Sequence, residues 1–191
     1  KNVFKKSFHR DNLQYVVRYT EKKDEQILHI LSRVPGSSII YVRNRKRAQE
    51  LAAWLQEQGL SADFYHAGLT THERTQKQKA WKNYNGKEGI RIMVCTNAFG
   101  MGIDKPDVRL VIHHDLPDTL EAYYQEAGRA GRDGKTAFAV LLYNPTDKTK
   151  ARKRIGDNFP PKDFIETVYH KTCDFLQIAL GCGAGRTYAL H

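Results

Sequence analysis

The feature that most constrains the fold is the regular alternation of short apolar runs with segments of helical periodicity. Five apolar runs have the length and composition of buried strands, and they lie at residues 38–42, 62–65, 90–95, 108–112 and 136–143. Helical patterns separate them at residues 46–58, 71–83 and 120–127. Because strands that alternate with helices are typical of parallel sheets, the sequence predicts an α/β fold. We expect an open, mostly parallel sheet with helices on both faces.

Two of the helices carry recognisable start signals. Thr70 is followed three residues later by Glu73, which is the pattern of a capping box. Asp118 is likewise followed by Glu121, directly after Pro117, so Asp118 is the predicted N-cap of the helix at 120–127.

Further elements are expected on either side of the core strands. Residues 13–19 fit an edge strand and residues 24–31 a helix. The composition changes near Pro145, where a strongly basic run begins and a helical pattern follows. We therefore expect one α/β lobe over residues 1–145, and a helical extension with a loose tail over residues 146–191.

The chain is strongly basic. Its 31 Lys and Arg residues against 21 Asp and Glu residues give a formal net charge of +10. The excess is clustered at residues 43–47, 77–82 and 148–154. Such a charge predicts a polyanionic partner. On charge alone, a solvated basic surface without a partner stays an equal alternative.

The cysteines and the hydropathy pattern indicate the compartment. Cys95, Cys173 and Cys182 share no close spacing, which favours a reduced, intracellular environment. No apolar stretch reaches membrane length and no signal-peptide pattern follows Lys1, so we expect no membrane partner. The chain also begins without a methionine, and we expect it to be a piece of a longer protein.

Small and polar residues follow several of the predicted strands. The carboxyl ends of parallel strands meet at one edge of a sheet, where ligands bind. The residues expected there are Arg43, Asn44, His66, Ala67, Gly68, Thr96, Asn97, His114 and Asp115. Their amides, hydroxyls and cations suit phosphate contacts. Each motif alone is also compatible with an ordinary turn or a core histidine, and their recurrence at one edge is what favours a site.

Two apparent nucleotide-binding motifs are incomplete. The stretch at 131–136 ends like a phosphate loop, but Arg129 stands where the first glycine belongs, and Thr136 opens a strand where a helix is required. A glycine pair ending at Gly102 fails the dinucleotide pattern, because Lys105 occupies the position of the third glycine. We therefore expect no complete nucleotide site within this chain.

The stretch QEAGRAGRDG at 125–134 carries two arginines among three glycines. Arginine is always charged and binds phosphate oxygens with a planar, two-pronged group. Arg129 and Arg132 could therefore stabilise a transferring phosphoryl group on a nucleotide held by a facing domain. The alternative is a helix stopped by glycine, with two exposed arginines on an ordinary turn.

Four long stretches, taken in order, resemble the successive motifs of the second motor lobe of RecQ-type DNA helicases. They are IIYVRNRKRAQELA, FYHAGLTTHERTQKQKAW, MVCTNAFGMGIDKPDVRLVIHHDLP and TLEAYYQEAGRAGRDG, and the resemblance covers residues 10–145. It implies a RecA-like lobe that closes with a first lobe on ATP and Mg²⁺ and moves 3′ to 5′ along single-stranded DNA at forks, in recombination and repair. The phosphate loop and the magnesium motif belong to that first lobe, so the fragment alone should be inactive.

The resemblance also implies roles for single residues. Arg132 matches the arginine finger that contacts the γ-phosphate, Arg129 its companion, and Gln125 the residue that opens this motif. Asp104 and Gly102 match the segment that links the nucleotide cleft to the DNA track. The strand-end residues from Arg43 to Asn97 named above match contacts with the DNA strand.

DEAD-box RNA helicases are the nearest rival family, but the glutamine and glutamate that open QEAGR and the stretch FGMG favour RecQ. Many RecQ members continue into a platform that holds zinc on four cysteines. Only Cys173 and Cys182 lie beyond residue 145, with His170 or His191 as further ligands, so no metal site is expected. The resemblance implies a nucleoid location in bacteria and a nuclear one in eukaryotes.

Two other functions remain open from the residues. A single-strand binding module that kept the fold and lost the motor would bind DNA without needing Arg129 or Arg132. A cofactor-dependent α/β enzyme is disfavoured, because the glycine fingerprint and a nucleophile with its base are both missing.

Overall fold

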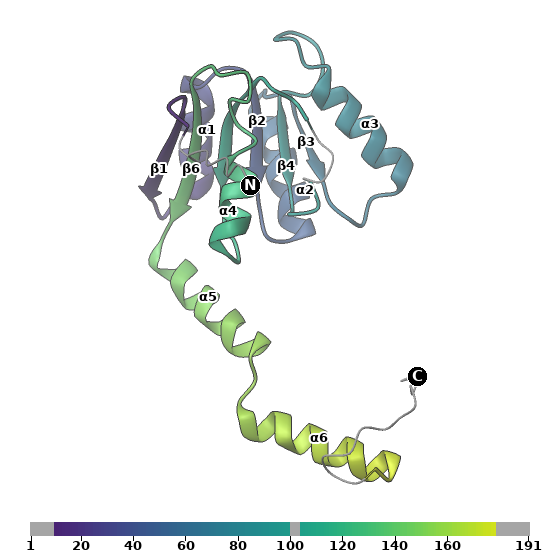
Figure 1. Cartoon of the computed structure of the whole chain (residues 1–191). Helices are drawn as coiled ribbons and strands as arrows, with labels where there is room; N and C mark the ends of the chain where they lie inside the picture. The colour runs from purple at the N-terminus through teal and green to yellow at the C-terminus, as the bar shows by residue number, and fades with distance from the viewer. Residues whose placement is uncertain (1–9, 100–103, 179–191) are drawn as a thin grey trace, which may run out of the picture. The chain divides into compact units, whose positions relative to one another are not determined.

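A computed structural model describes residues 10–99 and 104–178 (Figure 1). Within these residues a single sheet of parallel strands has the order β1-β6-β5-β2-β4-β3. The strands are β1 (Leu13–Tyr19), β2 (Ser37–Tyr41), β3 (Ala62–Tyr65), β4 (Ile92–Cys95), β5 (Val108–His113) and β6 (Ala137–Tyr143). Every neighbouring pair is parallel. The predicted open parallel sheet is confirmed, and β1 is the edge strand expected at residues 13–19.

Helices cover both faces of the sheet. They are α1 (Lys23–Arg33), α2 (Arg45–Glu57), α3 (Thr71–Lys82) and α4 (Leu120–Ala127). Ile27 of α1 and Leu51 of α2 belong to the apolar cluster on one face. Trp81 of α3 and Ala127 of α4 belong to the cluster on the other. Figure 1 shows α4 on the opposite side of the sheet from α1 and α2.

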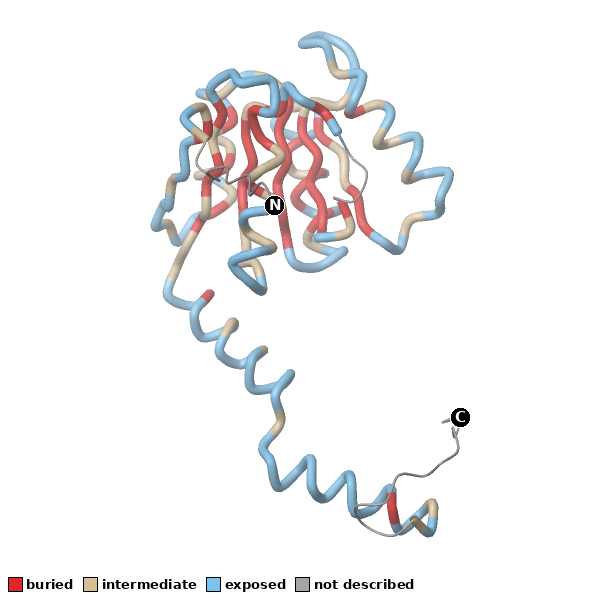
Figure 2. Tube along the Cα trace, in the orientation of Figure 1, coloured by how far each residue is buried: buried red, intermediate tan, exposed pale blue. Residues whose placement is uncertain are grey.

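The central strands are buried on both sides. All five residues of β2 and all four of β4 are buried, as the red strands in Figure 2 show. Successive side chains of a strand point to opposite faces, so Ile39 packs in one cluster and its neighbour Ile40 in the other. This explains why the strands appear in the sequence as nearly continuous apolar runs.

The helix starts agree with one predicted cap and correct the other. At α3, the Glu73 amide donates to Thr70 Oγ1 at 3.2 Å and the Thr70 amide donates to Glu73 Oε2 at 2.8 Å, so the capping box is confirmed. At α4 the predicted N-cap, Asp118, is wrong. Thr119 caps the helix by accepting from the Ala122 amide at 3.1 Å. Asp118 instead pairs with Arg43 at 2.5 Å, and this ion pair explains the shift by one residue.

The chain divides into two compact units, Lys1–Asp147 and Lys148–His191. The first contains the sheet. Helix α5 (Pro145–Asn158) begins in it, where buried Asp147 pairs with Lys23 at 2.8 Å. The second unit contains the rest of α5 and α6 (Lys162–Leu176), which covers the helical pattern expected beyond Pro145. Within the described ranges, no helix is long and apolar enough to cross a membrane.

Candidate functional site

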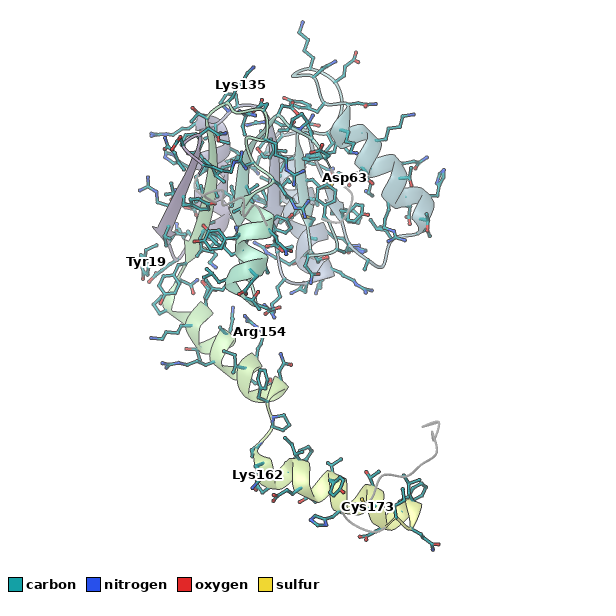
Figure 3. The ribbon with its side chains drawn as sticks, in the orientation of Figure 1. Tyr19, Asp63, Lys135, Arg154, Lys162 and Cys173 are labelled. Carbon is teal, nitrogen blue, oxygen red and sulfur yellow. The ribbon has the colours of Figure 1, made fainter. Side chains whose placement is uncertain are left out.

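The ends of the parallel strands form a polar edge. The Arg43 amide donates to Asp115 Oδ2 at 2.9 Å, which joins the residues that follow β2 and β5. The Thr96 amide donates to the Tyr65 carbonyl at 3.2 Å, which joins those that follow β4 and β3. The predicted strand-end residues therefore lie along one edge. Figure 3 marks this carboxyl edge by Tyr19, at the end of β1, and the opposite amino edge by Lys135, just before β6.

The side chains at this edge differ in how accessible they are. Arg43, Asn97, Ala67 and Gly68 are exposed. His66 is only 5% exposed, and its ring stacks on Phe64 with 5.5 Å between ring centroids. The contact of the His66 side chain with a DNA strand stays a prediction, and its burial matches the alternative of a core histidine. Within this trio, Ala67 and Gly68 are the parts that a ligand could reach.

Asn44 and Thr96 have structural roles at the same edge. Asn44 is the N-cap of α2, and its Oδ1 accepts from the Arg47 amide at 2.7 Å. Thr96 is 7% exposed, and its carbonyl accepts from the Phe99 amide at 3.0 Å. The helix cap at Asn44 and the turn at Thr96 bring backbone amides to the carboxyl edge, whether or not these amides bind a ligand.

A pocket of about 190 Å³ opens between these strand ends and α4. Its polar lining includes Arg43 and Asn97, together with the carboxylates of Asp115, Asp118 and Glu126. Negative and positive groups are therefore mixed in it. The sequence reasoning did not single out Asp118 or Glu126 as part of this edge, because both lie on or before a helix rather than directly after a strand.

A charged cluster ties the carboxyl edge to α1. His114 Nδ1 lies 3.3 Å from Asp115 Oδ2, and its Nε2 lies 3.6 Å from Asp24 Oδ1. Hydrogen bonding from His114, helped by Arg47, lowers the pKa of Asp24 to about 2. Burial is the largest influence on Asp115 and opposes its ionisation, but the bond and charge of His114, the Arg43 amide and the charge of Lys23 together outweigh burial and lower the pKa to about 2. Burial also favours neutral His114, yet its two carboxylate partners raise its pKa.

The amino edge of the sheet brings together two segments that are distant in sequence. Arg132 Nη1 lies 2.8 Å from Asp104 Oδ1. The Gly131 amide donates to the Val108 carbonyl at 2.8 Å, so the loop that carries Arg132 rests on the start of β5. Two residues expected at the nucleotide, Asp104 and Arg132, are therefore in contact. Gly102, expected beside them, lies outside the described residues.

The two arginines of QEAGRAGRDG occupy different environments. The Arg132 side chain is 41% exposed. Arg129 is half-buried and hydrogen bonds with Tyr41. Burial raises the pKa of the Tyr41 hydroxyl well above its usual value, and the positive charge of Arg129 opposes that rise. Gln125 is exposed on α4. Arg132 is thus the arginine that faces solvent, and Arg129 the one that supports the interior.

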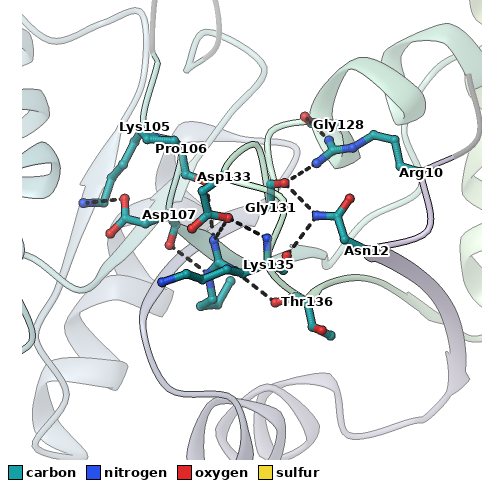
Figure 4. Close-up of polar contacts among 11 residues, drawn as sticks. Arg10, Asn12, Lys105, Pro106, Asp107, Gly128, Gly131, Asp133, Lys135 and Thr136 are labelled. Atoms are coloured by element: carbon teal, nitrogen blue, oxygen red, sulfur yellow. Dashed lines mark hydrogen bonds and ion pairs between the residues drawn. The ribbon is translucent and has the colours of Figure 1, made fainter. Parts of the chain in front are cut away.

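The loop between α4 and β6 is held by an arginine that the sequence analysis did not single out. Arg109 Nη2 donates to Asp133 Oδ1 at 2.6 Å, and its Nη1 donates to the Thr136 carbonyl at 3.1 Å (Figure 4). Because Arg109 sits inside an apolar strand pattern, only the pairing of β5 with β6 reveals that it faces this loop.

A model of the helicase conserved C-terminal domain matches residues 22–134. The chain belongs to this helicase family. This lobe is 44% identical over 147 residues to the ATP-dependent DNA helicase RecQ of Pasteurella multocida, and 44% identical over 159 residues to the RecQ-like DNA helicase BLM of Xenopus laevis. These alignments cover 76% and 80% of the chain. The resemblance to the second lobe of RecQ-type helicases is confirmed.

The helicase lobe spans only 23% of the Pasteurella protein and 11% of the Xenopus protein. Its fold also matches the E. coli DEAD-box protein SrmB in a crystal structure with regulator of ribonuclease activity A. That likeness has a TM-score of 0.63 and 27% identity, and it covers 81% of this chain and 88% of that one. The rival DEAD-box family therefore shares the RecA-like fold, while the RecQ proteins have the higher sequence identity.

Metal ligands are sparse among the residues that the structure describes. Cys95 and Cys173 are both buried and free, and no three His, Cys, Asp or Glu side chains there could hold a metal ion together. Cys182 and His191, two of the ligands considered for zinc, lie outside the described residues.

Proposed function

We propose that this lobe is the second motor lobe of an ATP-dependent, 3′ to 5′ DNA helicase of RecQ type, and that Arg132 is its arginine finger. The observation that carries the proposal is the exposed pair of Arg132 and Asp104 at 2.8 Å, on the two motifs expected to meet the nucleotide. The names of the relatives, ATP-dependent DNA helicases, support the same activity.

The environment of Arg132 fits a phosphate group. The Asp104 side chain is 74% exposed, and an ion pair this exposed contributes only about 0–1 kcal/mol. A phosphate oxygen can therefore replace the carboxylate at little cost and gain a charge-assisted bond to the guanidinium. ATP would supply the phosphoryl group that is transferred, and Arg132 would stabilise the negative charge that develops on it. Gln125, exposed on α4, would face the same cleft.

The buried companion Arg129 would act differently. Its positive charge acts on Tyr41, the last residue of β2, so Arg129 would support the junction between the sheet and α4. We propose that Arg129 connects the finger loop, which is the loop at residues 128–136 between α4 and β6, to this junction. Gly102 and Asp104 would complete the nucleotide side, while Mg²⁺ and the phosphate loop would be held by the first lobe.

The carboxyl edge would form part of the DNA track. Arg43, Asn97 and the exposed backbone at Ala67 and Gly68 supply positive charge and small side chains suited to phosphates. The connection between β4 and β5 begins at this edge with Thr96 and reaches the amino edge with Asp104. A displacement of this connection could therefore link nucleotide turnover to movement on single-stranded DNA.

The remaining parts of the proposal follow from the family. The lobe would occupy residues 1–145, and residues 146–191 would stand at the position of the helical platform without zinc. DNA forks in recombination and repair would be the substrates, at the bacterial nucleoid or in the eukaryotic nucleus. The fragment alone would not hydrolyse ATP, because it needs the first lobe.

The test is Arg132→Ala in the full-length protein. We expect DNA-stimulated ATP turnover to fall by about 10³-fold or more, while the dissociation constant for single-stranded DNA changes by less than about twofold. Lys135→Ala, which removes an exposed cation from the same loop, serves as the control and should leave turnover unchanged. If Arg132→Ala retains full turnover, the finger assignment is wrong, the stretch at 125–134 is only a turn, and the motor role proposed for this lobe fails.

A further inference from the structure

Two side chains that precede β1, Arg10 and Asn12, donate hydrogen bonds to the finger loop. Arg10 Nη1 donates to the Gly128 carbonyl at 3.1 Å, and its Nη2 donates to the Gly131 carbonyl. Asn12 Nδ2 donates to the Gly131 carbonyl at 2.7 Å and to the Lys135 carbonyl at 2.9 Å. Figure 4 shows the two side chains reaching the loop from the same side.

Arg10 has a physical reason to bind here. Gly128 is the C-cap of α4, and the last carbonyls of a helix lack partners and carry partial negative charge. A guanidinium meets both needs, since it donates several hydrogen bonds from one rigid plane and is always charged. Arg10 therefore fixes the point where α4 ends and the finger loop begins.

Asn12 is placed by strand pairing. Leu13 pairs with Ala137 in the parallel ladder of β1 and β6, and the Ala137 amide donates to the Asn12 carbonyl at 2.8 Å. The side chain of Asn12 is thereby directed at the loop that precedes β6. Its position depends on the register of two strands that lie more than a hundred residues apart in sequence.

The shared acceptor, the Gly131 carbonyl, lies next to Arg132. A peptide bond is planar, so the carbonyl of Gly131 is in one rigid unit with the nitrogen and Cα of Arg132. The Gly131 carbonyl accepts from the Gly134 amide at 3.1 Å within its own turn, and from Arg10 and Asn12 outside the loop. Fixing this carbonyl fixes the backbone from which the Arg132 side chain starts.

Gly131 makes the close approach possible. Its φ is +61°, and a Cβ at this position would lie 2.7 Å from Asn12 Nδ2 and 2.8 Å from Ala137 Cβ. Both distances are too short for a side chain. The loop therefore reaches Asn12 only because glycine stands directly before Arg132.

From this geometry we propose that Arg10 and Asn12 are positioning residues for ATP hydrolysis, which hold Arg132 in the orientation that stabilises the transferring phosphoryl group. The inference rests on the proposed role of Arg132. Both residues lie outside the part matched by the helicase family model, which begins at residue 22. A displacement of a catalytic group by about 1 Å can cost on the order of 10² in rate, so the loss of this grip should appear in turnover.

The experiment is a double-mutant cycle in the full-length protein, with kcat and KM for ATP and the dissociation constant for single-stranded DNA measured for each variant. Asn12→Ala is expected to lower kcat by about 10- to 100-fold, with KM and DNA affinity within about twofold of the parent. Arg10→Ala should give a similar loss, and Arg10→Lys should recover part of it, because it keeps the charge and loses the fork.

The cycle separates positioning from general damage. If Asn12 acts through Arg132, the double variant Asn12→Ala with Arg132→Ala should be no slower than Arg132→Ala alone. Arg91→Ala is the matched control, because Arg91 donates to the Leu31 and Val34 carbonyls at 2.7 and 2.8 Å at the C-terminal end of α1, and to the Gly36 carbonyl at 3.2 Å, rather than to carbonyls of the finger loop. It should leave kcat unchanged despite a comparable loss of hydrogen bonds.

Each result has one meaning. Losses that multiply in the double variant, or an Arg91→Ala variant as slow as Asn12→Ala, would overturn the positioning role. If Arg132→Ala abolishes turnover while Asn12→Ala and Arg10→Ala do not affect it, the positioning role fails and the proposed function stands. If Arg132→Ala itself has no effect, the proposed function fails.

Discussion

The two edges of the sheet are built by different means. At the carboxyl edge, polar residues directly follow the strands and bond mostly to their neighbours along that edge, as Arg43 does to Asp115. At the amino edge, one loop between α4 and β6 is held by side chains from other parts of the chain, such as Arg10 and Arg109. The first edge offers several accessible polar groups, and the second offers Arg132 on a loop that other side chains hold in place. We therefore expect variants at the carboxyl edge to change DNA affinity, and variants at the amino edge to change turnover.

After Arg132 itself, the largest effect is expected at Gly131. Gly131→Ala introduces a side chain at φ +61°, within 2.7 Å of Asn12 Nδ2, and should lower ATP turnover by about 100-fold with DNA affinity unchanged. Gly134→Ala is the matched control. It has φ +80°, but nothing lies within 4 Å of its Cβ position, so it should cost far less turnover. Equal losses from the two variants would show that backbone strain alone, and not displacement from Asn12, affects the finger.

The charged cluster at the carboxyl edge predicts a pH dependence of stability. The pKa of Asp115 is about 2 in the folded lobe, below its ordinary value, so its contribution is present above about pH 4 and is lost as the pH falls toward 2. The free energy of unfolding should drop by at most about 2 kcal/mol from this group. Denaturant unfolding at a series of pH values measures it.

His114 gives the opposite sign. Its pKa is raised, so its contribution is complete below pH 6.5 and is lost as the pH rises through the folded value. In His114→Gln, the free energy of unfolding should no longer fall as the pH rises through the folded pKa of His114. Its fall at acid pH should also become smaller, since Asp24 and Asp115 both lose a partner. A stability profile identical to that of the parent protein would contradict the cluster.

A smaller effect is expected for Arg43 at the track. Arg43→Ala should weaken single-stranded DNA binding by up to about tenfold and reduce the slope of log affinity against log salt by about 0.7, the loss of one phosphate contact. Turnover at saturating DNA should stay the same. Lys87→Ala removes an exposed charge before β4, at the other edge, and should change neither quantity. If both variants lower the DNA affinity equally, the affinity depends on the net charge of the protein and not on contacts at the carboxyl edge.

The smallest effect separates capping from phosphate binding at Asn44. Asn44→Ala should lower the free energy of unfolding by about 1 kcal/mol through loss of the bond from the Arg47 amide, and Asn44→Ser should restore most of it. If Asn44 also contacts DNA, Asn44→Ser should still bind less tightly. Restored stability together with restored affinity would assign Asn44 to the cap alone.

The sequence predicted the sheet well, because strand burial is a local signal. The strand at 62–65 and the edge strand at 13–19 have the predicted bounds, since both runs contain aromatic or β-branched residues and end at polar turns. The cap of α4 was misplaced by one residue, because Asp118 and Thr119 are both good capping residues and only the position of Arg43 decides between them.

The candidate site was less predictable than the fold. Arg132 and Asp104 were each assigned to the nucleotide side only through the family resemblance, and neither their contact nor the bonds of Arg10 and Asn12 to the loop were anticipated. No local pattern marks an asparagine that bonds to carbonyls more than a hundred residues away. Only the pairing of β1 with β6 brings them together, and such long-range pairing cannot be read from spacing along one chain.

The order of the strands has a consequence for how the lobe is made. β1, first in sequence, is bonded within the described residues only to β6, the last strand of the sheet. During synthesis on the ribosome, β1 must therefore wait until nearly the whole lobe has emerged before it finds its partner, and contacts of such long range form slowly. The contacts of Arg10 and Asn12 with the finger loop therefore also form late. Arg132 is therefore held in its orientation only at the last step of folding. A lobe that lacks β6 would contain Arg132 but not the contacts that orient it.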